Sequence, residues 1–72
     1  MSSSMRYKEY IGSVEFSENY GVFFGKVLGI RSLISYEGKN AAELASDFHK
    51  AIDDYLAACE EEGIHPETAS KT

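Results

Sequence analysis

The feature that most constrains the fold is one long amphipathic segment, residues 40–62, that follows a stretch patterned like strands. In a helix, successive residues are turned by about 100°, and the apolar side chains of this segment then share one stripe: Leu44, Phe48, Ala51, Ile52, Tyr55, Leu56 and Cys59. Asn40 with Glu43 is typical of a helix start, and Gly63 is typical of a helix end. A single helix covers only one face of a sheet, so the pattern predicts a sheet with one uncovered face.

The part before the helix is patterned as short strands separated by turns. Three strands are expected, at residues 7–16, 22–30 and 33–37. The predicted fold class is therefore α+β: a three-stranded antiparallel sheet with one long helix packed on one face, in the order β-β-β-α. The chain is expected to divide into a disordered N-terminus, one folded domain and a loose C-terminal tail, at residues 1–6, 7–63 and 64–72.

A hairpin register that pairs Phe16 with Phe23 assigns a face to each strand residue. Alternation then directs one set toward the helix: Gly12, Val14, Phe16, Phe23, Gly25 and Val27. The two glycines of this set lack side chains, so the helix could approach the backbone closely there. The other set lies on the uncovered face: Ile11, Ser13, Glu15, Phe24, Lys26 and Leu28. A slip of one residue would exchange the faces of one strand.

The uncovered face is predicted to carry an interface. Three apolar side chains cluster on it among polar ones, and an apolar centre with a polar rim is typical of interfaces. A partner or oligomer interface is therefore expected at Ile11, Phe24, Lys26 and Leu28. The chain has 72 residues and one cysteine, so it buries little surface and has no intrachain disulfide. A homo-oligomer, dimer or higher, or a permanent partner would supply stability, and an open strand edge offers an alternative route.

Charge is unevenly distributed along the chain. The net charge is −5, with a balance of +1 over residues 1–39 and −6 over residues 40–72. An acidic domain repels phosphate backbones, so direct nucleic-acid binding by this chain is not expected and a basic protein partner is favoured. An acidic helix face is equally typical of simple solvation. Glu60, Glu61 and Glu62, however, lie where the helix dipole disfavours negative charge, and stability alone does not explain them.

No motif predicts catalysis, a cofactor, a metal site or a small-molecule substrate. Cys59 lies on the apolar stripe and is interpreted as a small buried hydrophobe, while His49 lies at the stripe's edge. No histidine lies at metal-ligand spacing from the cysteine. A two-metal nuclease needs converging carboxylates, and the register directs Glu15 away from Glu43 and Asp47 of the helix. We therefore expect a protein that is not an enzyme.

Location is predicted from what the sequence lacks. No apolar run is long enough to cross a bilayer, and residues 1–4 lack the apolar core of a signal peptide. With a single cysteine, a cytoplasmic protein fits best.

Taken in order, these segments resemble the N-terminal domain of HicB-type antitoxins over about residues 7–66. Four runs carry the resemblance: YIGSVEF at residues 10–16, GVFFGKVLGI at 21–30, LISYEG at 33–38 and DFHKAIDDYL at 47–56. Their order and spacing, and the glycine before the capped helix, make the resemblance fairly specific.

The resemblance implies a partial RNase H-like fold without RNase H activity, in an antitoxin of a toxin–antitoxin system. The implied partner is a HicA-type toxin, a small basic RNase with a double-stranded-RNA-binding-like fold. Family members usually carry a second segment, ribbon-helix-helix or helix-turn-helix, through which they bind DNA. This sequence ends at Thr72, where that segment would begin, so we expect no DNA binding by this chain alone. The alternative is a stand-alone homo-oligomeric interaction module of the same fold, without a toxin or DNA-binding role.

Overall fold

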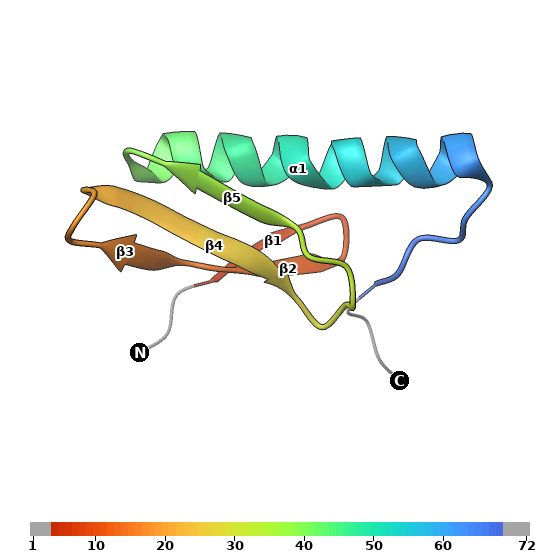
Figure 1. Cartoon of the computed structure of the whole chain (residues 1–72), viewed down its shortest axis with the longest axis horizontal. Helices are drawn as coiled ribbons and strands as arrows, with labels where there is room; N and C mark the ends of the chain where they lie inside the picture. Colours follow the sequence, from red (N-terminus) through yellow and green to blue (C-terminus); the bar gives the residue numbers. More distant parts are fainter. Residues whose placement is uncertain (1–3, 69–72) are drawn as a thin grey trace.

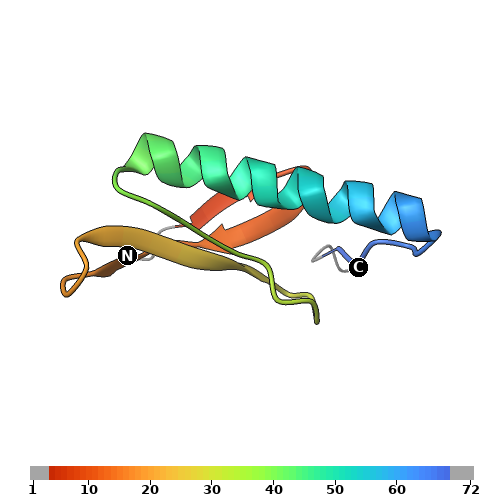
Figure 2. The same cartoon turned by 45° about the horizontal axis from the view of Figure 1, so that its top comes forward.

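The computed structural model describes residues 4–68 and shows one helix packed on an antiparallel sheet of five strands (Figure 1). The strands are β1 (Ser4–Tyr7), β2 (Tyr10–Ser13), β3 (Glu15–Ser17), β4 (Val22–Leu28) and β5 (Ser35–Gly38). The helix α1 (Ala41–Glu62) runs along one face of the sheet, as the turned view also shows (Figure 2). The α+β class is confirmed, and the expected count of three strands is wrong.

The extra strands come from the segment expected to form the first strand. β2 and β3 are two parts of it, and both pair with β4: Gly12 opposite Val27, and Phe16 opposite Phe23. β5 pairs with the other side of β4, and β1 pairs with β2. The predicted hairpin register is therefore confirmed, and β4 is the central strand.

β1 corrects the expected disordered start at residues 4–6, while residues 1–3 lie outside the described part. Residues 4–6 join Tyr7 in a strand that returns through a two-residue turn into β2. The turn residues Lys8 and Glu9 have φ values of 50° and 70°, a conformation usually taken by glycine or asparagine. Neither residue is typical of such a turn, so the turn was not predicted. The backbone region that the two residues adopt costs roughly 1 kcal/mol or more each.

The break between β2 and β3 has a side chain as its cause. The Tyr36 hydroxyl donates to two carbonyl oxygens, that of Ser13 at 2.9 Å and that of Lys26 at 3.1 Å. The Lys26 amide donates to Ser13 Oγ at 3.1 Å. Hydroxyl groups of Tyr36 and Ser13 thus satisfy backbone groups that an unbroken ladder would have paired directly.

The core lies between α1 and the covered face of the sheet. Its buried members are Tyr10, Val27, Ile34, Tyr36, Leu44, Phe48 and Ile52. Phe16, predicted to be core, is 53% exposed. It lies at the end of the sheet and its ring packs on Phe23, with 4.9 Å between the ring centroids. Tyr10, which was not among the expected core residues, is 1% exposed.

The two glycines of the covered face are needed for close packing. A Cβ on Gly12 would lie 2.1 Å from the Tyr36 hydroxyl oxygen and 2.8 Å from Phe48 Cε1. A Cβ on Gly25 would lie 1.9 Å from the Ser13 carbonyl oxygen and 2.9 Å from Tyr36 Cε1. Tyr36 therefore occupies the space that both glycines leave, and Phe48 of the helix reaches the sheet at Gly12.

Both helix ends match their predicted signals. Asn40 Oδ1 accepts from the Glu43 amide at 2.8 Å, and Glu43 Oε1 accepts from the Lys39 amide at 3.1 Å. Gly63 has φ 67°, and its amide donates to the Glu60 carbonyl oxygen while the Ile64 amide donates to that of Cys59. This is the Schellman arrangement, which satisfies carbonyls that the helix leaves unpaired.

The part of the tail that the structure describes, residues 64–68, packs back onto the domain. Glu67 makes three hydrogen bonds to separate elements. Its carbonyl oxygen accepts from the Tyr10 hydroxyl, and its amide donates to Tyr55 Oη at 3.0 Å. Its Oε1 accepts from the Arg31 amide at 2.6 Å. The expectation of a loose tail therefore differs from the structure at Glu67, and residues 69–72 lie outside the described part.

The helix also protects one strand edge. α1 packs most closely on β5, which lies beside it in both views (Figures 1 and 2). The Glu37 amide of β5 donates to Asp47 Oδ2 of the helix at 3.0 Å. A helix side chain therefore takes a backbone donor that would otherwise be available to another strand. Within residues 4–68, no helix is long and apolar enough to cross a membrane.

Candidate functional site

The face of the sheet opposite α1, here called the open face, is the first candidate surface. Register and alternation place on it the four predicted interface residues Ile11, Phe24, Lys26 and Leu28. Phe24 is 37% exposed and Leu28 40%, while Ile11 is half-buried. The structure therefore brings the predicted residues together on a surface that no other part of residues 4–68 covers.

Side chains on the open face form rows across the strands. Phe24 lies between Glu15 of β3 and Glu37 of β5, its two register partners. Lys26 lies between two serines, Ser35 as its register partner and Ser13 as its hydrogen-bond partner. An aromatic ring flanked by carboxylates is thus followed, two residues along β4, by a cation flanked by hydroxyls.

A shallow hollow of about 580 Å³ lies at one end of the open face. Its lining includes Phe24 and Val22 of β4, Tyr20 of the preceding turn, and the carboxylates Glu37 and Asp47. Tyr20 is 81% exposed. The hollow has apolar walls with two acidic groups at one side, which suits an apolar side chain with a cationic neighbour.

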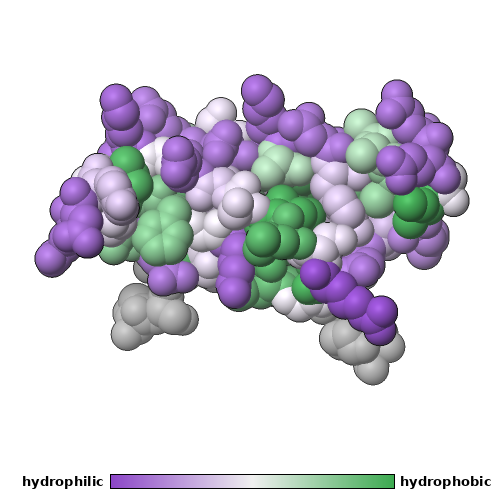
Figure 3. Space-filling view, in the orientation of Figure 1, coloured by the Kyte–Doolittle hydropathy of each residue, from purple (hydrophilic) through white to green (hydrophobic). Residues whose placement is uncertain are grey.

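The outer side of α1 is the second candidate surface. Glu43, Asp47, Asp54 and Glu61 follow one another at spacings of four, seven and seven residues, so they lie along one line of the helix, here called the acidic stripe. The stripe extends about 27 Å at 1.5 Å per residue. Figure 3 shows hydrophilic side chains along most of the helix side, and hydrophobic ones gathered below over the sheet.

Most of the acidic stripe has no cationic partner in the part of the chain that the structure describes. The one ion pair found there joins Lys8 to Asp53, which lies off the stripe. Lys50 lies on the same flank of the helix as the stripe, so the local charge is about three negative units. The last turn of the helix holds no basic residue. The stripe is therefore available to a basic partner.

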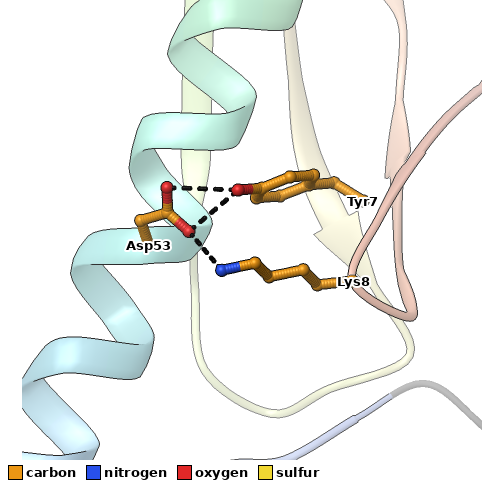
Figure 4. A network of polar contacts seen from close by, with 3 residues as sticks. All are labelled: Tyr7, Lys8 and Asp53. Carbon is orange, nitrogen blue, oxygen red and sulfur yellow. Dashed lines mark hydrogen bonds and ion pairs between the residues drawn. The ribbon is translucent and has the colours of Figure 1, made fainter.

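Between the two surfaces, a polar cluster fastens the β1–β2 hairpin to the helix (Figure 4). The Tyr7 hydroxyl lies 3.1 and 3.2 Å from the two carboxylate oxygens of Asp53, and Lys8 Nζ lies 3.1 Å from Oδ1. The Tyr7 ring also stacks on His49, with 4.1 Å between centroids. The Lys8 hydrogen bond holds the pKa of Asp53 below its ordinary value, and Asp53 raises the pKa of Lys8. Both charged groups are exposed, so the cluster orients the hairpin more than it stabilises the fold.

The buried polar groups serve the fold. Burial raises the pKa of the Tyr36 hydroxyl to about 12, and the nearby side-chain hydroxyl of Ser13 offsets part of that shift. Burial likewise raises the pKa of Tyr10. Cys59 is 6% exposed, which confirms its expected burial. Within residues 4–68, no three histidine, cysteine or carboxylate side chains lie close enough together to hold a metal ion.

Sequence reasoning missed the residues that complete the open face. Ser35 and Glu37 belong to it because β5 pairs with β4, a register that the sequence did not assign. Tyr20 at the hollow was read only as part of a turn. Its signal was available, since an aromatic side chain at an exposed turn is uncommon in a small domain.

No family model, curated protein or solved structure matches this chain. The resemblance to HicB-type antitoxins therefore stays a prediction that depends on the quoted residues.

Proposed function

We propose that this domain is an antitoxin-like binding module that neutralises a HicA-type RNase toxin by direct protein–protein contact. The acidic stripe is the observation that carries the proposal. A basic RNA-binding surface on the toxin would meet Glu43, Asp47, Asp54 and Glu61 in place of RNA phosphates. Inhibition would then be steric and electrostatic, without catalysis or a cofactor, in the cytoplasm where the toxin meets RNA.

Two features support a binding role for the stripe over simple solvation. The last helical turn concentrates negative charge at Glu60, Glu61 and Glu62, where the dipole disfavours it, and holds no basic residue in compensation. The chain also leaves most of the stripe unpaired, since its one described ion pair lies elsewhere. Glu43 and Asp47 also accept backbone hydrogen bonds within the fold, while Glu61 carries charge that the helix dipole disfavours. Such charge is well placed to attract a cationic partner and accelerate its association.

The test first looks beside this gene for one that encodes a small basic protein of the HicA type, and uses that protein as the partner. Purified domain should bind it, restore growth when the two are co-expressed, and bind more weakly as salt rises, because exposed charges are screened. Asp54→Lys should raise the dissociation constant by about tenfold or more, equivalent to 1.4 kcal/mol.

Glu18→Lys is the matched control, with the same charge change in an exposed turn away from the helix. It should change the dissociation constant by less than about threefold. Equal losses in the two variants would show that net charge acts and the stripe does not. Absence of binding by the unmodified domain would overturn the proposal.

The second candidate is a homo-oligomeric interaction module of the same fold, without a toxin. One observation favours it: the charges on the open face balance, with Arg6 and Lys26 against Glu15 and Glu37. Two copies could approach through this face without net repulsion, which the helix side does not allow. Absence of a neighbouring gene for a small basic protein would favour this candidate.

A further inference from the structure

We propose that the open face binds a second copy of this chain about a twofold axis that crosses β4 at Gly25, between Phe24 and Lys26. The inference is independent of toxin binding, because Phe24 and Lys26 of β4 lie outside the acidic stripe. The order of charges along β4 selects a second copy of the chain as the partner and a single register for the contact.

Four twofold axes near the centre of β4 would stack this strand on its copy, and three of them bring like charges together. An axis across β4 at Phe24 would place Glu15 of one copy opposite Glu15 of the other. An axis at Lys26 would stack the two lysines. An axis along β4 would place Glu15 opposite Glu37 and again stack the lysines. Like charges that face each other across an interface repel, so these arrangements are disfavoured.

The axis at Gly25 matches each row with a complementary one. The twofold rotation reverses the direction of β4 and places Lys26 over Phe24 of the second copy. Lys26 then lies between that copy's Glu15 and Glu37. The ammonium group gains an aromatic face and two carboxylates. Ser13 and Ser35 then face those same glutamates and have hydroxyl donors for them.

The apolar residues also find partners in this arrangement. Leu28, four residues from Phe24 along β4, comes to lie opposite Val22 of the second copy, at the hollow. Stacked sheets cross at about 30°, so contact concentrates at the centre of β4 and weakens toward the edge strands. Phe24 and Lys26 lie at that centre, which makes them the residues on which association depends.

The size of the face predicts a reversible dimer. Four adjacent strands at about 4.8 Å and seven residues at about 3.3 Å give a projected area of roughly 400–500 Å² per copy. This is at the low end for specific interfaces, which bury about 800 Å² per partner. Association should therefore depend on concentration, and both helices of the dimer face outward.

The experiment measures the oligomeric state of the full chain by sedimentation equilibrium from about 5 to about 500 µM, a range that brackets micromolar dissociation constants. The unmodified chain should dimerise. Two variants should each weaken dimerisation at least tenfold: Lys26→Glu, and the double variant Glu15→Lys with Glu37→Lys. Each variant places like charges opposite one another in the proposed register. An equimolar mixture of the two variants should form a heterodimer, since every altered charge then meets its opposite.

Lys50→Glu on the exposed side of α1 repeats the charge change of Lys26→Glu away from the face, and should leave dimerisation unchanged. Circular dichroism checks that each variant is folded. A monomer throughout the concentration range, or an oligomer that ignores both face variants, would overturn the proposal. Folded variants that each dissociate but fail to recombine would overturn the register. Toxin binding by Lys26→Glu should stay unchanged, so failure of this inference and failure of the antitoxin proposal give different results.

Discussion

The two sides of the sheet contain the same kinds of side chain in different surroundings. On the covered face, Phe48 of the helix is fully buried and touches Tyr36, with 4.9 Å between ring centroids. On the open face, Phe24 lies between two glutamates and is 37% exposed. The comparison separates two tasks in one small domain: the covered face provides the stability, and the open face and the helix exterior are available for partners.

The largest expected effect tests this separation directly with one substitution on each side. Phe48→Ala should lower the free energy of unfolding by about 3–5 kcal/mol, because it leaves a cavity in the core. That loss is enough to unfold so small a domain. Phe24→Ala, measured at a concentration where the chain is monomeric, should cost only about 1–2 kcal/mol, because 37% of the Phe24 surface is already exposed to water. Urea denaturation measures both, and a loss below 1 kcal/mol for Phe48→Ala would place the stability elsewhere.

The next effect concerns the Tyr36 hydroxyl, which lies at the break between β2 and β3. Tyr36→Phe should cost about 1–3 kcal/mol, because the Ser13 carbonyl loses its donor and the Lys26 carbonyl keeps only the Ser13 hydroxyl at 3.4 Å. Tyr20→Phe is the matched control, as its ring is 81% exposed, and should be neutral within about 0.5 kcal/mol. Thermal denaturation of both variants distinguishes a structural hydroxyl from a general sensitivity to tyrosine replacement.

The same hydroxyl predicts a decline in stability at alkaline pH. The folded-state pKa of Tyr36 is about 12, above the ordinary value of 10.0. Its contribution is therefore fully present below pH 10 and is lost as pH rises from 10 toward 12, with a slope of about 1.4 kcal/mol per pH unit. The raised pKa of Tyr10 acts in the same direction. Denaturation of Tyr36→Phe over this range should show a shallower slope, and an identical slope would contradict the assignment.

The smallest effect concerns the helix exterior. Glu61→Gln should raise the free energy of unfolding by about 0.3–1 kcal/mol at low ionic strength, because it removes negative charge from the negative end of the helix dipole. The same change should weaken binding of a basic partner. Glu18→Gln, outside the helix, should do neither. A destabilised Glu61→Gln would show that the acidic end serves the fold itself.

Local signals predicted the helix well, and they explain why its ends were correct. Asn40 and Gly63 act through backbone groups within four residues of themselves, so the sequence alone specifies them. The pairing of Phe16 with Phe23 was also predicted, since a short turn limits the available registers. The open-face residues Ile11, Phe24, Lys26 and Leu28 followed from that register by alternation.

Features that depend on distant contacts were not predictable in this way. The turn at Lys8 and Glu9 has no turn-forming residue, and the Lys8–Asp53 contact that fastens it to the helix spans 45 residues. The exchange of Phe16 for Tyr10 in the core depends on where the helix lies over the sheet. Tyr10 is also held by Glu67, 57 residues away, a contact that composition gives no reason to expect.

The hydrogen bond from Glu37 to Asp47 has a consequence for how copies of this domain can aggregate. Edge-to-edge growth of a sheet needs two open edges on every unit, one to accept a neighbour and one to pass pairing onward. With the Glu37 amide of β5 occupied by α1, the other strand edges, those of β1 and β3, both lie on the opposite side of β4. Growth that adds a neighbour on both sides of the sheet would therefore first require the helix side chain to release the Glu37 amide of β5.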